Sequence, residues 1–308
     1  MPRPPRIAFV GSGGAARGIA HLGVIKAIEE LGLRPQIFVG ASAGAIVGAT
    51  YGQGIPLDDL VDSYRLPWKR KTSGPFLHET TFFGPPSLRE LADPGHLTSG
   101  LFSLHGFERF LEKRLPENDF RRIPATVLVT ACDIDGRGRE VFGRGHRDDV
   151  PISRAVAASC CVPGLFRPYR IGDRYFVDGE VARTLSADLA VEAGADIVIV
   201  SNIYRPMETR PDRPSVARRG PLRVLNQSLS IILSEKERRG IELYHRVYPG
   251  VTFIHISPDI GHLGFLNRFA ARQLVMRGYR AAMTELVQAK ARGAFAARDD
   301  SPAKPSLN

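Results

Sequence analysis

The sequence predicts an α/β fold, in which short buried strands alternate with helices. Two units near the N-terminus indicate this fold: Ile7 to Val10 is an apolar run followed by a glycine-rich turn and a helix, and Ile37 to Val39 is a second run followed by small helix-forming residues. The 308 residues, 43% of them hydrophobic, can bury a full core, and no linker-like run divides them. We therefore predict one domain over residues 1–297 and a polar, disordered tail over residues 298–308.

The first helix and the loop before it form the first unit. Apolar residues recur at helical spacing from Ile19 to Leu31, and Gly32 stands where a left-handed C-terminal cap belongs. Between strand and helix lies the sequence GSGGAARG, residues 11–18. Backbone N–H groups in such a loop point toward negative charge, which is either a phosphate or an oxyanion.

The phosphate interpretation requires a dinucleotide fingerprint. The loop fits its first half as Gly11-x-Gly13-x-x-Ala16, but the fingerprint also needs an acidic residue at the end of the second strand. Here that strand ends in Gly40 instead. The oxyanion interpretation is therefore favoured, and no cofactor is expected.

The second strand leads directly into GASAG, residues 40–44, which is a GxSxG pentapeptide. A serine on a sharp strand-to-helix turn exposes its Oγ above the sheet, and Gly40 and Gly44 leave room that a Cβ would fill. An ordinary glycine-rich turn is the simpler alternative. The strand-turn-helix context makes Ser42 the candidate nucleophile.

A serine nucleophile needs a base, and one route is a histidine. An α/β-hydrolase triad would use an acid and then one of the late histidines, His245, His255 or His262. Such a fold has several strands before its elbow, whereas two precede Ser42. His255 alternates within a strand-like run and needs no catalytic role.

The other route is a carboxylate. Strand-like residues 169–171 and 174–177 flank Gly172-Asp173, which is a two-residue hairpin signal with glycine first. Asp178 therefore ends a strand, and Gly179 places its carboxylate at a tight turn. A plain Asp-Gly turn is the alternative that this short pattern leaves open.

The cysteines and the search for targeting signals limit the metal sites and the cellular location that we expect. Cys132, Cys160 and Cys161 are odd in number and lack metal-site spacing, so we expect buried thiols and no metal. No apolar leader precedes the first strand, and no apolar run is long enough to span a bilayer. We expect a cytoplasmic protein.

The formal net charge is +10, carried mostly by scattered arginines. A solvated surface is the simplest interpretation; contact with an anionic membrane stays open, and no nucleic-acid partner is expected. Residues 64–105, which include Trp68–Lys71, form either an interfacial loop or a cover over the core. Near the C-terminus, an apolar stripe from Val275 to Leu286 predicts a core-facing helix. The oligomeric state is not predicted.

Four blocks, in order, resemble the patatin-like phospholipases, a family of serine acylhydrolases with a Ser-Asp dyad and no histidine. They are the glycine loop with its basic residue (13–18), GASAG (40–44), residues 155–168, and Val-Asp-Gly-Glu at 177–180. Each block is weak alone, and together they are specific.

The resemblance implies a three-layer α/β/α sandwich around a mainly parallel sheet. It also implies that Ser42 is the nucleophile, that Asp178 is the base, and that the loop forms an oxyanion hole with the residues Gly13, Gly14, Ala15 and Arg17. The substrate class would be a phospholipid or lysophospholipid ester. The alternatives are a triad esterase and a catalytically silent lipid-binding relative.

Three departures from the family pattern concern the rim of the site. Ala15 replaces the usual third glycine of the loop, which costs energy if that position has a positive φ. Glu180 stands where a small residue usually follows Asp-Gly. Arg183-Thr184 replaces an Asn-Pro-like continuation.

Overall fold

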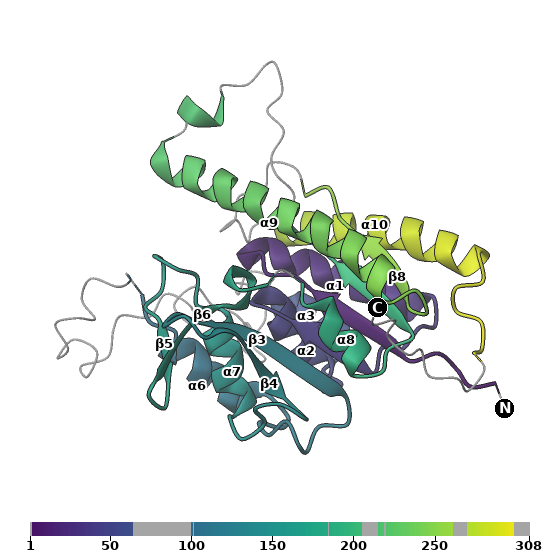
Figure 1. Ribbon diagram of the computed structural model, residues 1–308, viewed down its shortest axis with the longest axis horizontal. Coiled ribbons are helices and arrows are strands. Elements are labelled where there is room, and N and C mark those ends of the chain that lie inside the picture. Colours follow the sequence, from purple (N-terminus) through teal and green to yellow (C-terminus); the bar gives the residue numbers. More distant parts are fainter. Residues whose placement is uncertain are drawn as a thin grey trace.

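The computed structural model describes residues 2–63, 100, 102–183, 185–204, 215–218, 220–260 and 270–298, with side chains omitted at 221–223, 225 and 226. Within these residues the sheet has eight strands, in the order β5-β6-β3-β2-β1-β7-β8, and β4 pairs with β3 (Figure 1). A parallel part is followed by an antiparallel edge. The parallel strands are β1 (Ile7–Gly11), β2 (Ile37–Gly40), β3 (Thr126–Asp133), β7 (Ile197–Ser201) and β8 (Thr252–Ile256); the antiparallel ones are β4 (Gly138–Gly143), β5 (Tyr169–Ile171) and β6 (Arg174–Asp178).

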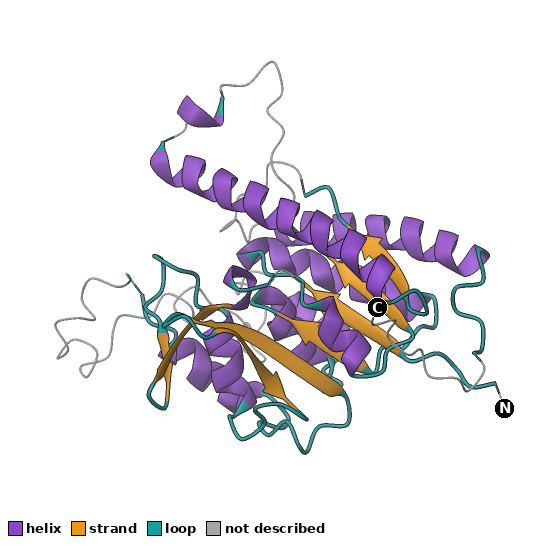
Figure 2. Ribbon diagram, viewed as in Figure 1, coloured by secondary structure: helices purple, strands orange, loops and turns teal. Residues whose placement is uncertain are grey.

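Helices cover both faces of the sheet (Figure 2). The larger core lies beneath α1 (Ala20–Glu30), α2 (Ala43–Tyr51), α3 (Leu57–Ser63), α6 (His105–Arg114), α7 (Ile152–Ser159) and α10 (Ala271–Ala291). The smaller core lies beneath α8 (Ala187–Glu192) and the C-terminal half of α9 (Pro221–Val247). Short 3-10 helices η1 (Ala15–Ile19), η4 (Gly179–Val181) and η5 (Val216–Arg218) complete these elements.

The strands supply both cores because their side chains alternate. In β1, Ile7 and Phe9 join the larger core, whereas Ala8 and Val10 join the smaller one. Strands buried on both faces are continuously apolar, as the runs in the sequence are. The predicted three-layer fold with a mainly parallel sheet is confirmed.

Most of the predicted elements are present, with small shifts at their ends. Gly32 has a φ of 73° and follows α1, and Gly172 has a φ of 67° in the turn between β5 and β6, so both predicted glycine positions are confirmed. The apolar stripe of α10 is buried and packs on α1. Among the described helices, none is both long and apolar enough to cross a membrane.

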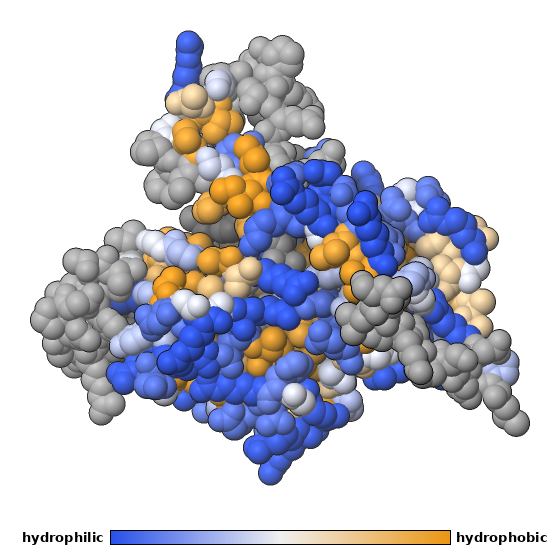
Figure 3. Space-filling view, in the orientation of Figure 1, coloured by the Kyte–Doolittle hydropathy of each residue, from blue (hydrophilic) through white to orange (hydrophobic). Residues whose placement is uncertain are grey.

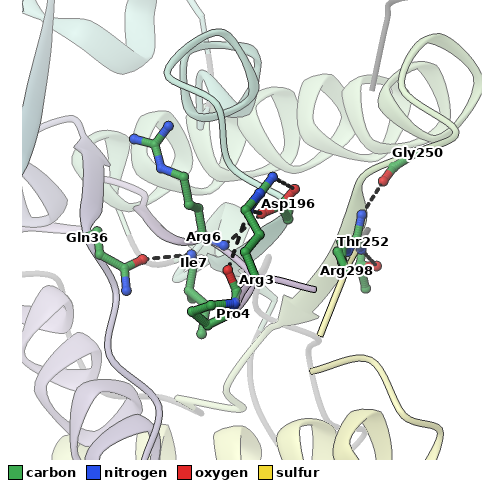
Figure 4. Close-up of polar contacts among 9 residues, drawn as sticks. All are labelled: Arg3, Pro4, Arg6, Ile7, Gln36, Asp196, Gly250, Thr252 and Arg298. Carbon is green, nitrogen blue, oxygen red and sulfur yellow. Dashed lines mark hydrogen bonds and ion pairs between the residues drawn. The ribbon is translucent and has the colours of Figure 1, made fainter. Parts of the chain in front are cut away.

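The two ends of the described chain meet beside β7 and β8 (Figure 4). Arg3 forms two hydrogen bonds with the Asp196 carboxylate, at 2.6 and 3.0 Å, and exchanges backbone hydrogen bonds with Arg298. Arg298 also donates to the Gly250 carbonyl oxygen at 2.6 Å. Arg298, which the sequence assigned to the tail, is thus held in place; the rest of that tail and the predicted interfacial residues 68–71 lie outside the described residues.

Candidate active site

Ser42 lies between β2 and α2 in a conformation that non-glycine residues rarely adopt. Its φ is 51° and its ψ is −116°, and the residue is 4% exposed. A Cβ on Gly44 would lie 2.1 Å from the Gly11 carbonyl oxygen, and one on Gly40 would lie 2.3 Å from the Gly44 carbonyl carbon. The two predicted elbow glycines are therefore required, because α2 starts directly against the end of β1.

The structure brings Asp178 close to Ser42 from a different strand of the sheet. Asp178 is the last residue of β6, and the Ser42 side chain lies close enough to its carboxylate to lower the pKa of that group. Its Oδ1 accepts from the Glu180 backbone N–H at 3.1 Å, and its own N–H donates to the Cys161 carbonyl at 2.8 Å. Backbone contacts therefore hold the Asp178 carboxylate in place.

Sheet register explains how the two residues meet. β2 and β6 pair with the same edge of β3, one after the other: Gly40 pairs with Val129, and Asp178 pairs with Ala131, while β4 lies along the other edge. β3 runs past the end of β2, and the antiparallel β6 returns along that overhang. Asp178 therefore ends β6 close to the level at which β2 ends.

Burial alters the acid–base chemistry of Asp178. The residue is 5% exposed, and burial raises the pKa of its carboxyl to about 6, although the hydrogen bonds from Glu180 and Ser42 act in the opposite direction. A carboxylate with this pKa is still mostly ionised at neutral pH and is a stronger base than an exposed one.

The predicted oxyanion residues lie in one loop above Ser42. The Gly13 N–H donates a 2.9 Å hydrogen bond to Glu180 Oε1, and Gly14 has a φ of 147°. Ala15 has a φ of 48°, so the expected strain at this departure from glycine is present. Arg17 is buried on η1, and its backbone N–H donates to the Gly14 carbonyl at 3.1 Å.

His21 supports this loop and was missed from the sequence. Its ring is fully buried, with Nδ1 2.7 Å from Ser201 Oγ and Nε2 2.9 Å from the Ser12 carbonyl oxygen. Because a carbonyl only accepts, Nε2 carries the hydrogen and Nδ1 accepts from the serine. Burial lowers the pKa of His21 to about 4, so the neutral ring persists at neutral pH. No local pattern distinguishes this histidine from others on an apolar helix face.

Ser159 and Cys160 complete the floor beneath Ser42. Ser159 Oγ accepts the Ser42 backbone N–H at 2.8 Å, and the Cys160 thiol contacts the Ser42 side chain. All three cysteines are buried and free, as predicted. The sequence drew attention to this segment as a whole, without assigning Ser159 a contact.

The late histidines lie away from Ser42. His245 on α9 and His255 on β8 pack together with ring centroids 5.8 Å apart. β8 is three strands from β2, which is about 14 Å at ordinary strand spacing. His262 and Thr184 fall outside the described residues, while Arg183 forms a 3.0 Å ion pair with Asp188. Within the described ranges, no group of three or more His, Cys, Asp or Glu side chains could hold a metal ion.

A three-layer α/β fold with a serine on a strained elbow, beside a buried carboxylate, is typical of serine-dependent acyl hydrolases. Residues 9–191 match the patatin-like phospholipase family. Because that match spans more than half of the chain, the protein belongs to this family.

Individual relatives agree with this family. The chain is 25% identical over 199 residues to an uncharacterised NTE family protein of Mycobacterium bovis, covering 65% of this chain and 49% of that protein. It is 27% identical over 197 residues to lysophospholipase nte1 of Aspergillus fumigatus, covering 64% of this chain and 12% of that protein. The chain thus spans half or less of the length of these relatives.

VipD of Legionella pneumophila has a similar fold. The TM-score is 0.50 at 16% identity, and the match covers 93% of this chain and 68% of that one.

Proposed function

We propose that the protein hydrolyses the acyl ester of a phospholipid or lysophospholipid, with Ser42 as nucleophile and Asp178 as base. The observation that carries this proposal is the Ser42 side chain on a strained elbow, next to a buried carboxylate whose pKa is raised to about 6. The relative named as a lysophospholipase supports this substrate class.

The proposed reaction has two halves. Asp178 accepts the Ser42 proton while Oγ attacks the ester carbonyl carbon, and collapse of the tetrahedral intermediate expels the alcohol, which takes that proton. Asp178 then accepts a proton from water, and the water oxygen attacks the acyl-serine carbonyl. Collapse of the second intermediate releases the fatty acid and returns the proton to Ser42.

The glycine loop is the proposed oxyanion hole. Gly13, Gly14 and Ala15 supply backbone N–H groups, and Arg17 supplies positive charge within η1. One such donor typically lowers the barrier by about 3 to 4 kcal/mol, so the loop matters as much as the base. The His21 contacts to Ser12 and Ser201 hold the start of this loop in place.

We also propose that the protein contacts an anionic membrane surface, where its substrate lies. Its net charge of +10 favours such a surface. Large apolar side chains on the N-terminal half of α9 are 41 to 54% exposed, namely those of Val224, Leu229, Ile231 and Ile232. Figure 3 shows hydrophobic surface on the part of the molecule where this helix extends away from the sheet.

A fluorophosphonate probe and a soluble short-chain ester test the chemistry together. Wild type should be labelled and should hydrolyse the ester, whereas Ser42→Ala should do neither and Asp178→Asn should lose nearly all turnover, about a thousandfold or more. Alanine at His245, His255 or His262 should leave turnover within a few-fold of wild type.

Other outcomes of this experiment identify the alternatives. If one of the histidine variants folds but loses ester turnover by several hundredfold, a Ser-Asp-His triad would be favoured. A wild-type protein that binds lipid without labelling or turnover would be the catalytically silent relative.

A further inference from the structure

Glu180 is a buried acid whose position the reaction above does not use. It lies on η4, two residues after Asp178, and is 2% exposed. Its Oε1 accepts the Gly13 N–H at 2.9 Å, and its Oε2 is buried with no hydrogen-bond partner among the described residues. A buried carboxyl with one unsatisfied oxygen destabilises the folded protein, so its presence calls for an explanation.

The carboxyl of Glu180 lies on the side of Gly13 that faces the nucleophile. A Cβ placed on Gly13 would lie 3.2 Å from Glu180 Cγ, 3.2 Å from Ser42 Cβ and 2.3 Å from Tyr204 Oη. These three side chains therefore crowd the same side of the loop. An ester carbonyl oxygen attacked by Ser42 would need this space.

The contact resembles the one that a reaction intermediate would make. A carboxyl oxygen that accepts a backbone N–H has the geometry of an oxyanion in its hole. Since Gly13 has a single N–H, Glu180 and the substrate oxyanion compete for it. An ionised Glu180 would also repel negative charge developing beside it.

The titratable groups that act on Glu180 come from several segments. Asp178 lies on β6, Glu237 and Lys236 lie on α9, and Tyr204 follows β7; Arg17 on η1 lies near Tyr204. Burial first, and Asp178 next, raise the pKa of Glu180 well above its usual range, while the Gly13 hydrogen bond opposes this rise. Ionisation is therefore disfavoured, which makes the hydrogen bond to Gly13 easier to exchange for one to an oxyanion.

We propose that Glu180 closes the oxyanion hole in the resting enzyme and must leave the Gly13 N–H before an ester carbonyl binds. This inference rests on the proposed function of Ser42 and the glycine loop. The backbone beneath Glu180 is fixed, because a Cβ on Gly179 would lie 2.3 Å from the Thr130 carbonyl oxygen. Lys236 Nζ also donates to the Val181 carbonyl at 3.2 Å. Rotation of the Glu180 side chain therefore opens the hole, and the turn itself stays in place.

The test compares Glu180→Ala with wild type, using kcat/KM for a soluble short-chain ester and the rate of fluorophosphonate labelling at Ser42. Removing the carboxyl frees the Gly13 N–H, so both rates should rise about tenfold, the effect of one lost hydrogen bond. Asp188→Asn is the control, since it removes a buried carboxylate on α8 that bonds Arg139 at 2.8 Å and not the glycine loop, and it should change both rates by less than about twofold.

Several results would overturn the proposal. Equal or slower labelling of folded Glu180→Ala, with a labelled wild type, would show that Glu180 does not close the hole. If Glu180→Gln keeps the wild-type rate while Glu180→Ala loses it, a side-chain oxygen bonded to the Gly13 N–H assists the reaction instead. Absence of labelling and turnover in both wild type and Glu180→Ala would remove Ser42 as nucleophile, and the closure with it.

A measurement on the wild type avoids any folding defect of the variants. In a crystal structure of the fluorophosphonate adduct of Ser42, the phosphonyl oxygen should accept the Gly13 N–H and the Glu180 carboxyl should have moved away. Glu180 still bonded to Gly13 in that adduct would contradict the proposal.

Discussion

At the scale of single residues, the site combines two neighbouring features that each destabilise the folded state. Ser42 holds a strained backbone conformation, and Asp178 and Glu180 are both carboxyl groups removed from water. Burial makes Asp178 a stronger base and makes the ionised form of Glu180 unfavourable. The surrounding packing, including the close contact of Gly44 with Gly11, stabilises this arrangement.

The raised pKa of Asp178 predicts the pH dependence of turnover. Only the ionised carboxylate can accept the Ser42 proton, so kcat/KM for a soluble ester should fall tenfold per pH unit below about 6. A pH series from about 4.5 to 9 on the wild type would measure this limb. A limb centred near the ordinary aspartate pKa of about 4 would contradict the effect of burial.

The raised pKa of Asp178 also determines how the stability of the folded protein changes with pH. Because the folded pKa lies above the unfolded value, the stabilising contribution of protonated Asp178 is complete below about pH 4 and is lost as the pH rises through about 6. In urea unfolding, Asp178→Asn should therefore gain stability relative to wild type over this range. The shift corresponds to at most about 3 kcal/mol.

At the scale of elements, the loop before α1 depends on contacts from several directions. The Ser12 carbonyl accepts from His21 and from the Gly44 N–H, and Ser12 Oγ accepts the Ile203 N–H at 2.9 Å. One serine thus joins the ends of β1 and β7 to the start of α2. The orientation of the N–H groups in the glycine loop follows from this junction.

Ala15 is the position at which this loop carries strain. Ala15→Gly should raise the free energy of unfolding by about 1 kcal/mol or less, because relief of the left-handed conformation is partly offset by greater freedom of the unfolded chain. Ester turnover should rise or stay level, since the N–H is kept. Denaturant unfolding and steady-state kinetics measure the two effects.

Ala16→Gly is the matched control for Ala15→Gly. Ala16 is in the same 3-10 helix without a positive φ, so glycine there should lower stability by up to about 1 kcal/mol. A large fall in turnover for Ala15→Gly would mean that the Ala15 methyl group packs against substrate or helix, in which case the loop acts through more than its backbone.

At the scale of the whole molecule, α9 changes character along its length. Its N-terminal half carries exposed apolar side chains, whereas its C-terminal half carries exposed ion pairs that join Glu235 and Glu242 to Arg238 and Arg239. Figure 1 shows the N-terminal end of the helix extending away from the sheet. Lys236 connects this helix to the turn that carries Glu180.

The proposed membrane contact predicts that Ile231→Ser with Ile232→Ser weakens binding to anionic vesicles about tenfold or more, because two half-exposed apolar side chains no longer enter the interface. Co-sedimentation measures binding, and hydrolysis of a soluble ester should stay near wild type. Wild-type binding should be weaker to zwitterionic vesicles and at high salt.

Leu243→Ser is the control for this pair. Leu243 is 51% exposed on the same helix, within its charged half, and should tolerate the change. If vesicle binding is equal in all three proteins, the N-terminal half of α9 is not a docking surface, and the excess positive charge belongs to an arginine-rich solvated surface.

Local patterns in the sequence were sufficient for the strands, the elbow and the end of the hairpin. The pattern of Gly40, Ser42 and Gly44 indicates a sharp turn, because only small side chains fit there. Gly172-Asp173 indicates a hairpin, because glycine tolerates a positive φ. Such signals depend on backbone sterics within a few residues. They therefore located both candidate catalytic residues at strand ends.

Contacts between distant segments were decided only by the tertiary structure. Glu180 reaches Gly13 across 167 residues and His21 reaches Ser201 across 180, so neither contact leaves a local pattern. Asp178 meets Ser42 because β3 extends past β2 and the antiparallel β6 returns along it. The sequence by itself determined which residues end strands and turns, since that depends on local backbone geometry. The register of the sheet decided which of those ends meet, because register follows from packing both faces at once.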